Sequence, residues 1–341
     1  MHGASYAEVM TTSALTVPSL VVPSTGDSSV LRIEQREVPA PGPGQVRVKV
    51  AATGVNFIEI YQREGVYPMP LPFVLGDEGA GRVESVGEGV EEFAVGDAVA
   101  WAQGPGSAAG AVVVDAAKVV AVPAQVGLVT AAASMLQGLT AHYLVTTTYA
   151  VQRGDTALVH AVAGGVGQLL VQLLKAKGAT VIGTAGTPEK VEIGRALGAD
   201  HVIDYSTFTE AQELADEIKA LAGGGVAVAY DGVGKATFDA SLASLRPRGL
   251  LVLFGAASGQ VPPFDIQRLN RGGSLYLTRP TLADHLTTPE ELRWRSGELF
   301  AAIGDGTLQV SIGGEYPLEE AGRAYDDLAG RRSTGKLLLV P

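Results

Sequence analysis

The stretch from Thr156 to Gly178 constrains the fold more than any other part of the sequence. It begins with a short apolar run, Thr156 to Ala161, which has the length and character of a buried strand. The glycine cluster Gly164-Gly165-Val166-Gly167 follows, and apolar residues then recur at helical spacing up to Gly178. A strand, a tight glycine turn and a helix form the first half of a dinucleotide-binding unit, although Val162 replaces the first glycine of the fingerprint. A purely structural turn is the alternative interpretation of this cluster.

The pattern downstream favours the dinucleotide-binding interpretation, because strands and helices alternate there. Strand patterns cover 179–184, 201–204, 226–231, 250–254 and 274–277, and helical patterns cover 188–197, 210–221 and 236–245. This rhythm is typical of a doubly wound parallel sheet. We therefore predict an α/β protein with a Rossmann domain.

The two ends of the chain have a different pattern from its middle. Short strands with frequent turns dominate residues 18–110, a helical stretch covers 129–149, and an apolar strand closes the chain at 336–340. We expect a β-rich domain made of both chain ends, with the Rossmann domain inserted between them. The predicted boundaries are 14–138 and 281–341 for the β-rich domain and 139–280 for the Rossmann domain, and the residues before 14 are expected to be a mobile leader or a cloning remnant.

Composition excludes several classes of function. With 46% hydrophobic residues and 44 glycines, the chain is expected to fold around a large core. It has no cysteine, which rules out disulfides, cysteine nucleophiles and thiolate metal sites, and a net charge of −11 argues against a nucleic-acid surface. No apolar run of about 18 residues is present to span a membrane, and no secretory signal is apparent, so we expect a cytoplasmic protein. The serine-hydrolase elbow and the phosphate loop of nucleotide hydrolases are also absent.

Several further motifs stand in the order typical of one family. They are Gly54-Val-Asn-Phe-Ile-Glu-Ile-Tyr61, Gly65-Val-Tyr-Pro68, Gly76-Asp-Glu-Gly-Ala-Gly81, Gly96-Asp-Ala-Val99, Gly138-Leu-Thr140, Ala163-Gly-Gly-Val-Gly167, Gly183-Thr-Ala-Gly-Thr-Pro-Glu-Lys190, Tyr230-Asp-Gly-Val-Gly234, Phe254-Gly255 and Leu277-Thr-Arg-Pro280. From about Pro18 to Pro341 the chain resembles the zeta-crystallin-like quinone oxidoreductases of the zinc-free medium-chain dehydrogenase/reductase superfamily, the bacterial NADPH:quinone oxidoreductases in particular. The resemblance implies a GroES-like β domain, an NADPH cleft between the domains and a homodimer. The apolar strand at 274–277 would be an exposed sheet edge, where two copies could pair.

The choice of cofactor can be predicted at the end of the second Rossmann strand. An NAD site places Asp or Glu there, but this strand ends in the small, uncharged run Thr184-Ala-Gly-Thr187, which leaves room for a phosphate. The resemblance implies that NADPH is bound and that its 2′-phosphate contacts Gly186, Lys190, Tyr205 and Arg331, with Arg332 as an alternative to Arg331. Lys190 could instead be a solvated surface charge, and Tyr205 a half-buried loop aromatic.

The resemblance also implies which residues face the reacting end of the cofactor. Asn56 and Tyr61 come from the matching family motif and are expected beside the nicotinamide with Thr140. A helix or turn cap for Asn56 and a core aromatic for Tyr61 are the alternatives. Phe254, Gly255 and Ser258 lie at or just beyond the end of a predicted strand, where α/β proteins bind ligands.

Three functions remain open from the sequence. The first is an NADPH-dependent quinone oxidoreductase, and the second is a zinc-free alkenal or enoyl double-bond reductase on the same scaffold. The third is an NADPH-binding protein with a structural or RNA-binding role, as in some zeta-crystallin relatives.

Metal independence is a testable prediction of this sequence. Where related zinc enzymes carry cysteine and histidine ligands, this chain has Asn56, Asp77 and Gln137, and its five histidines form no ligand motif. A quinone or conjugated double bond delocalises the arriving charge, so its reduction needs less help from a Lewis acid than alcohol–ketone interconversion does. NADPH oxidation by a quinone should therefore be unchanged after exhaustive chelation. Activity that is lost on chelation and restored by stoichiometric zinc would contradict this prediction.

Overall fold

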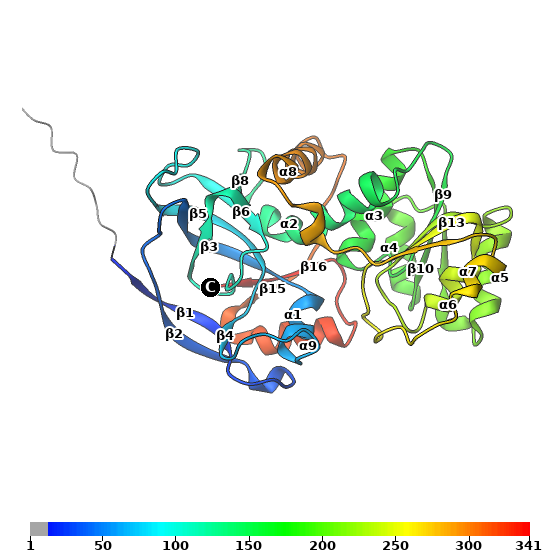
Figure 1. Ribbon diagram of the computed structural model, residues 1–341, viewed down its shortest axis with the longest axis horizontal. Helices are drawn as coiled ribbons and strands as arrows, with labels where there is room; N and C mark the ends of the chain where they lie inside the picture. Colours follow the sequence, from blue (N-terminus) through cyan, green and yellow to red (C-terminus); the bar gives the residue numbers. More distant parts are fainter. Residues whose placement is uncertain (1–12) are drawn as a thin grey trace, which may run out of the picture.

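The computed structural model describes residues 13–341, which form a β-rich part and a Rossmann part joined side by side (Figure 1). Residues 1–12 of the predicted leader lie outside the described residues. The chain starts in the β-rich part, crosses into the Rossmann part and returns at its C-terminal end (Figure 1). This arrangement confirms the predicted fold class, a Rossmann sheet inserted in a GroES-like β domain.

The β-rich part is built around β3 (Gln45–Val55), which pairs with β5, β7 and β16. The sheet has the order β15-β16-β3-β5-β6-β8, with β7 on β3. Its other strands are β5 (Glu78–Val86), β6 (Ala98–Ala102), β7 (Ala111–Asp115), β8 (Val119–Ala121), β15 (Ile312–Pro317) and β16 (Lys336–Val340). A smaller antiparallel sheet consists of β1 (Leu15–Val22), β2 (Arg32–Val38) and β4 (Phe73–Val74). Pairing of the last strand with β3 closes the domain from both chain ends, with Leu338 opposite Gly54.

The Rossmann part contains a six-stranded parallel sheet with the order β11-β10-β9-β12-β13-β14. Its strands are β9 (Thr156–Val159), β10 (Thr180–Ala185), β11 (His201–Asp204), β12 (Val226–Asp231), β13 (Leu245–Leu253) and β14 (Tyr276–Thr278). Its helices are α3 (Gly165–Ala176), α4 (Pro188–Ala196), α5 (Ala211–Leu221), α6 (Phe238–Ala243) and α7 (Gln267–Arg271). The predicted elements are all present. Several boundaries differ by one or two residues, and the largest difference is at β13, which begins at Leu245, where it pairs with Val226, instead of at Leu250.

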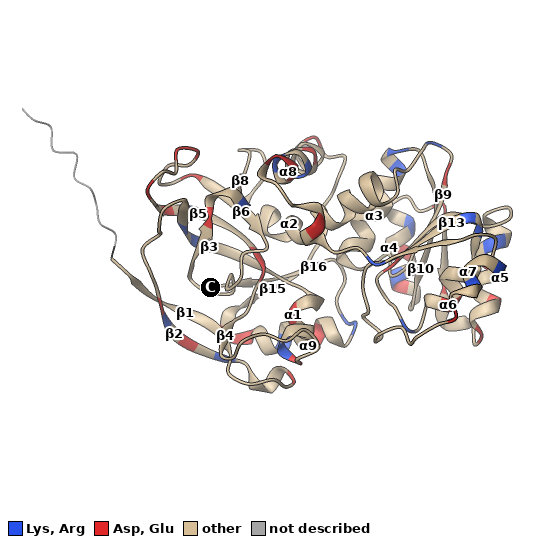
Figure 2. Ribbon diagram, in the orientation of Figure 1, with Lys and Arg blue, Asp and Glu red and all other residues tan. Residues whose placement is uncertain are grey.

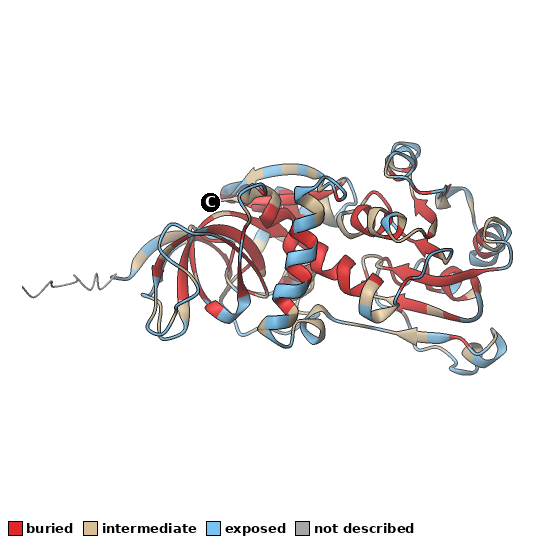
Figure 3. Cartoon of the chain, turned by 90° about the horizontal axis from the view of Figure 1, so that it is seen from above, coloured by how far each residue is buried: buried red, intermediate tan, exposed pale blue. Residues whose placement is uncertain are grey.

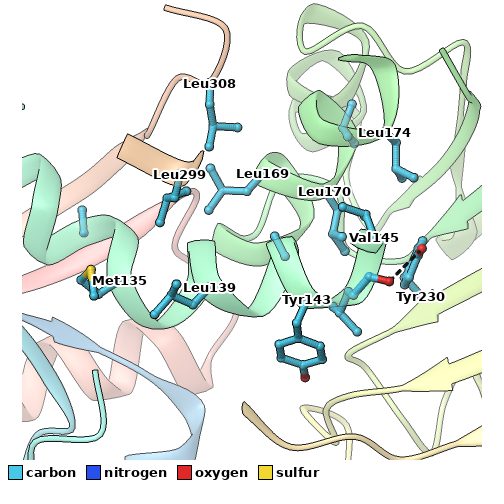
Figure 4. Packing of buried hydrophobic residues seen from close by; sticks show 14 of the residues in the cluster. Met135, Leu139, Tyr143, Val145, Leu169, Leu170, Leu174, Tyr230, Leu299 and Leu308 are labelled. Atoms are coloured by element: carbon cyan, nitrogen blue, oxygen red, sulfur yellow. Dashed lines mark hydrogen bonds between the residues drawn. The ribbon is translucent and has the colours of Figure 1, made fainter. Parts of the chain in front are cut away.

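A single apolar helix, α2 (Leu128–Tyr143), lies at the junction of the two parts and continues into a π-helical turn, Leu144–Thr148. Its side chains belong to the largest apolar core, which also contains Ala52 from β3. Figure 4 shows Leu169 and Leu170 of α3 packed beside the helix. Most residues of α2 are buried, and Figure 3 shows many buried strand residues beside exposed ones, since β2 and β15 contain no buried residue. The 128–148 segment is long and apolar enough to cross a membrane, but 72% of its most apolar window is buried inside the protein, as in a core helix.

Three more helices complete the β-rich part. They are α1 (Phe57–Arg63), α8 (Pro289–Gly304) and α9 (Ala321–Ala329). Helix α8 packs on α2, and α9 packs on α1 and on β16. The domain limits proposed from the sequence remain predictions, and the one between 138 and 139 falls within α2.

Val162, which departs from the glycine fingerprint, has a packing role. Its side chain is fully buried between β10 and α4, where it fills the space beside Gly183 and Gly194. The left-handed backbone of the turn is found one residue earlier, at Ala161, with φ of 54°. A valine can therefore occupy the fingerprint position because glycines on the facing elements make room for it.

This packing generates a prediction for Gly194, which lies inside α4. A Cβ at this position would lie 2.6 Å from Cγ2 of Val162 and 3.1 Å from Cγ2 of Val202. We expect Gly194→Ala to lower the free energy of unfolding by about 1–3 kcal/mol through overpacking. Alanine is the better helix former by about 1 kcal/mol, so helix propensity alone gives the opposite sign. Denaturant unfolding of the variant distinguishes the two effects.

Gly297 provides a matched control because it is also inside a helix, α8, but nothing lies within 4 Å of the position that a Cβ would take there. Gly297→Ala should raise the free energy of unfolding by up to about 1 kcal/mol. In a double-mutant cycle, Val162→Ala should recover part of the loss caused by Gly194→Ala. Additive effects of the two substitutions would contradict the packing account.

Candidate active site

A cavity of about 500 Å³ lies between the Rossmann sheet and the β-rich part. It is bounded by the glycine turn after β9, by the ends of β10, β12 and β13, and by segments of β3, α2 and the chain beyond α9. Ligand sites of α/β proteins lie at these carboxyl ends of parallel strands, and the volume is in the range of small-molecule sites. Among the predicted site residues, those that line it are Gly164, Gly165, Val166, Gly167, Gly186, Lys190, Tyr205, Phe254 and Arg331.

The glycine turn gives a ligand access to the first turn of α3. Gly164 closes the turn by donating its N–H to the carbonyl of Ala161 at 2.9 Å. A side chain at Gly165 would collide with the amide of Gln137, and one at Gly167 would collide with the Ala161 carbonyl. The absence of both side chains lets α3 start against α2, with its first N–H groups directed at the cavity. Such a helix start binds phosphate well.

Two cations meet at the far end of the cavity, where a carboxylate would stand in an NAD site. Lys190 donates from Nζ to the backbone carbonyl of Arg331 at 2.6 Å. Burial, and then the neighbouring Arg331 charge, lower the pKa of Lys190. An anion placed between the two side chains would relieve their repulsion. Tyr205 lies beside them because Gly186 has no side chain, and a Cβ there would be 2.7 Å from the Tyr205 hydroxyl.

The two neighbouring arginines differ in what they contact. Arg332 lies in an ion pair with Asp327, with Nε 2.8 Å from Oδ1. Arg331 lines the cavity and has a left-handed backbone with φ of 56° directly after α9. This position usually favours glycine. Arg331 is therefore better placed than Arg332 for a phosphate in the cavity.

Asn56 is the N-cap of α1 and is buried behind the cavity wall formed by Val55 and Phe57. Its Nδ2 donates to Glu78 at 2.8 Å, and its Oδ1 accepts from Lys336 Nζ at 2.6 Å. Both sides of the amide are thus engaged within the protein. Its expected contact with the nicotinamide stays a prediction.

Tyr61 and Thr140 come from different helices. Tyr61 is half-buried, with its ring edge-on to Tyr67 at a centroid distance of 5.4 Å. Burial raises the pKa of Tyr61, whereas the Ala256 backbone N–H and the Arg279 charge lower it. Thr140 is buried and donates its hydroxyl to the Leu136 carbonyl at 2.7 Å within α2. Their proposed places beside the nicotinamide are not tested by these contacts.

Gly255 and Ser258 shape the loop after β13. A side chain at Gly255 would collide with the backbone of Gly232 in the loop after β12. The Ser258 hydroxyl donates to the Val233 carbonyl at 2.7 Å and accepts from the Ala236 N–H at 2.9 Å. These contacts hold together two loops whose residues Val233 and Ala257 line the cavity. Neither Gly255 nor Ser258 lines it.

His160 is a cavity residue that sequence reasoning missed. It is buried, and its ring nitrogens lie 2.7 Å from the Thr184 hydroxyl and 2.8 Å from the Ser241 hydroxyl. Ser241 donates in turn to Asp231 at 2.7 Å. Burial lowers the pKa of His160, although Asp231 opposes that shift. The available signal in the sequence was a histidine at the end of a predicted strand. The hydrogen-bond network joins the ends of β9, β10 and β12 through His160, Thr184 and Asp231.

A second buried network lies behind Asn56. Lys336 contacts Glu78 in an ion pair that is almost completely inaccessible to solvent. Glu59 accepts from the Asn56 N–H at 2.8 Å and from the Tyr325 hydroxyl at 2.7 Å. Burial and repulsion by Asp77 raise the pKa of Glu59 to about 8. Sequence reasoning missed these contacts because Lys336 and Tyr325 are more than 250 positions from their partners, Glu78 and Glu59.

These residues do not fit a zinc ion. The positions matching the ligands of zinc enzymes are amides at Asn56 and Gln137 and a carboxylate at Asp77, and the Lys336 ammonium lies next to Asn56. Within residues 13–341 no group of three or more His, Cys, Asp or Glu could hold a metal ion. Positive charge beside Glu78 comes from the chain itself, through Lys336.

Comparison with known proteins agrees with this architecture. Residues 42–151 match the alcohol dehydrogenase GroES-like domain, and residues 165–293 match the zinc-binding dehydrogenase family. A quinone oxidoreductase of Pseudomonas aeruginosa is 45% identical over 93% of this chain and 97% of the relative. A 2-haloacrylate reductase of Burkholderia is 42% identical over 90% of this chain and 94% of the relative.

A solved structure extends the comparison to three dimensions. The Escherichia coli quinone oxidoreductase complexed with NADPH matches with a TM-score of 0.92 and 40% identity, covering 95% of this chain and 100% of that one. The similarity therefore spans both domains and the cavity between them. The chain belongs to the quinone oxidoreductase family of the medium-chain dehydrogenase/reductase superfamily.

Proposed function

We propose that this protein is an NADPH-dependent quinone oxidoreductase that works without zinc and reduces a quinone in the cleft between its domains. The observation that carries the proposal is the meeting of Lys190 and Arg331 at one end of the cavity of about 500 Å³. The glycine turn at the start of α3 supplies the complementary site for a pyrophosphate. Membership of the quinone oxidoreductase family supports the assignment.

Some site residues would bind the phosphates of NADPH, and others would orient its nicotinamide. The N–H groups after Gly164 would hold the pyrophosphate, and Lys190, Tyr205 and Arg331 would hold the 2′-phosphate. Asn56, Tyr61 and Thr140 would surround the nicotinamide, with the loop from Phe254 to Ser258 on its other side. NADPH, when bound, supplies a hydride. The apolar walls of the cavity exclude water from the reacting atoms.

A conjugated double bond is the second candidate acceptor. The 42% identity to a relative named 2-haloacrylate reductase favours it, because that protein's substrate carries a conjugated carbonyl. A panel of quinones, enals and enoyl thioesters, followed by NADPH absorbance, tests both candidates. Turnover of quinones alone supports the first, and turnover of enals alone supports the second. Failure with every acceptor, together with tight RNA binding, would favour the structural or RNA-binding role.

The oligomer is proposed to be a homodimer that forms through β14 in the cytoplasm. This strand is the edge of the Rossmann sheet and pairs only with β13 within residues 13–341. Its Tyr276 is 60% exposed. An uncovered edge strand invites pairing with a second copy. Figure 2 shows both acidic and basic positions along the ribbon of each domain.

The dimer proposal predicts a selective effect of charge on β14. Wild-type protein should sediment as a dimer at micromolar concentration, and Tyr276→Glu should shift it towards monomer because paired strands would bring two carboxylates together. Val95→Glu is the matched control, since Val95 is 67% exposed in the other domain. A wild-type monomer at this concentration would refute the dimer.

The cation pair predicts a preference for NADPH over NADH of at least about tenfold. A hydrogen bond to a charged group contributes about 1.5–3 kcal/mol, and about 1.4 kcal/mol corresponds to a factor of ten. Lys190→Ala should weaken NADPH binding and leave NADH binding nearly unchanged, because only NADPH carries the phosphate. The salt dependence of NADPH binding should also decrease. Equal losses for both cofactors, measured by fluorescence titration, would mean that Lys190 supports the fold instead.

Arg331 and Arg332 provide an internal comparison for this prediction. Arg331→Gly removes the charge and also relieves the left-handed backbone, so it should weaken NADPH binding while raising the free energy of unfolding by about 1 kcal/mol. Arg332→Ala breaks only an exposed ion pair with Asp327 and should change NADPH binding little. The reverse order of effects would assign the phosphate to Arg332.

A further inference from the structure

Arg279 is a cation beside the cleft with no role in the function described above. It follows β14 directly, and its guanidinium donates to the carbonyl of Leu253 at 3.1 Å. Leu253 is the last residue of β13 and precedes Phe254, which lines the cavity. The side chain of Arg279 is thus held at the strand ends where the reacting part of the ligand is expected. Within residues 13–341 it makes no ion pair with a carboxylate.

Two phenols from other segments share this region. Tyr61 comes from α1 in the β-rich part, and Tyr143 comes from the end of α2. The Arg279 charge is close enough to lower the pKa of both phenols, although burial has the larger effect and raises each pKa. Figure 4 shows the Tyr143 ring on the opposite side of α2 from Leu169 and Leu170. Arg279 is therefore fixed at the end of β13 by Leu253, and its charge acts on phenols of both α1 and α2.

A backbone donor completes the group. The N–H of Ala256 lowers the pKa of Tyr61, and it donates to no backbone carbonyl among the described residues. Ala256 is buried, and its neighbours Phe254 and Ala257 line the cavity. A guanidinium, a phenol and a backbone N–H are all donors that can stabilise a negative oxygen.

We propose that Arg279 is a catalytic residue that binds the acceptor oxygen on which negative charge develops, with the Ala256 N–H and the Tyr61 hydroxyl beside it. The inference rests on the proposed function and assigns the acceptor end of its site. A quinone that accepts a hydride gains one hydrogen and two electrons, and the negative charge comes to rest on a carbonyl oxygen. One proton from water then gives the hydroquinone, while the nicotinamide is left oxidised. Arg279 would favour acceptors whose reduction places negative charge on an oxygen atom.

The site can be tested without turnover by using 4-nitrophenol, whose ionised form is an aromatic ring with a negative oxygen. In the full-length protein saturated with NADP+, a nearby cation should lower the pKa of the bound phenol by about one unit, which is a tenfold preference for the anion. The pKa is measured from the visible absorbance of the bound nitrophenolate. Arg279→Gln should abolish the shift, and Arg279→Lys should keep most of it.

Turnover provides the second measurement. Arg279→Gln should lower kcat/KM for a quinone by about 10- to 100-fold, since a hydrogen bond to a charged group is lost in the transition state. The affinity of Arg279→Gln for NADPH should change less than about twofold. If Arg279 only tied β14 to β13, the substitution would disturb cofactor binding as well as turnover. Arg279→Lys should recover most of the activity because it restores the charge.

The outcomes separate the two proposals. A bound nitrophenol that ionises at the same pH in wild type and in Arg279→Gln would overturn the role of Arg279, and so would a wild-type protein that does not bind nitrophenolate. A normal shift in a protein that reduces no quinone would leave the anion site in place and refute the proposed function. Quinone turnover that is unaffected in Arg279→Gln would refute the role of Arg279 alone.

Discussion

The burial of α2 by both domains is the interaction on which the rest of the structure depends. Met135, Leu139 and Tyr143 are almost inaccessible to solvent, and the same core contains side chains from β3, α3 and β12 (Figure 4). Burying one such apolar side chain contributes about 1.5–3 kcal/mol, so separation of the domains along α2 would be costly. The cavity has a fixed wall on this side, where Gln137 of α2 meets Gly165 at the start of α3.

A second constraint is the buried ion pair between Lys336 and Glu78. A charge removed from water is tolerated when it is paired and hydrogen-bonded, and both conditions hold here, since Asn56 contacts each partner. The pair also joins the last strand to the β3–α1 junction, because Lys336 Nζ reaches the Val55 carbonyl at 3.2 Å. The positive charge beside Glu78 is supplied by Lys336, a side chain of the C-terminal strand β16. Its place is set by sheet pairing.

Local pattern was sufficient for the Rossmann strands and helices, because the apolar runs and glycine stops at Gly178 and Gly198 are short-range signals. The role of Val162 was not predictable, since it depends on two glycines that are distant in sequence and face it only in the fold. Among the candidate site residues, the glycine turn follows from local spacing, whereas Arg331 came only from the family resemblance. Arg279 was part of the family motif Leu277-Thr-Arg-Pro280 but was given no role, and His160 was missed because a lone histidine at the end of a strand does not show which side chains surround it. The residues around Arg279 and His160 come together only because of the order of the strands in the Rossmann sheet.

Charge within the cleft must act against the charge of the whole protein. The net charge of −11 repels an anionic cofactor at long range, and screening at physiological ionic strength limits that repulsion to about 8 Å. Affinity for a dinucleotide phosphate must then come from contacts at short range, which Lys190 and Arg331 are positioned to make. Lys190 is held by its hydrogen bond to the Arg331 carbonyl, and Arg331 is positioned by the left-handed backbone after α9. Among the described residues neither pairs with a carboxylate that an incoming phosphate would have to displace. A site preorganised in this way loses little free energy to rearrangement when the anion arrives.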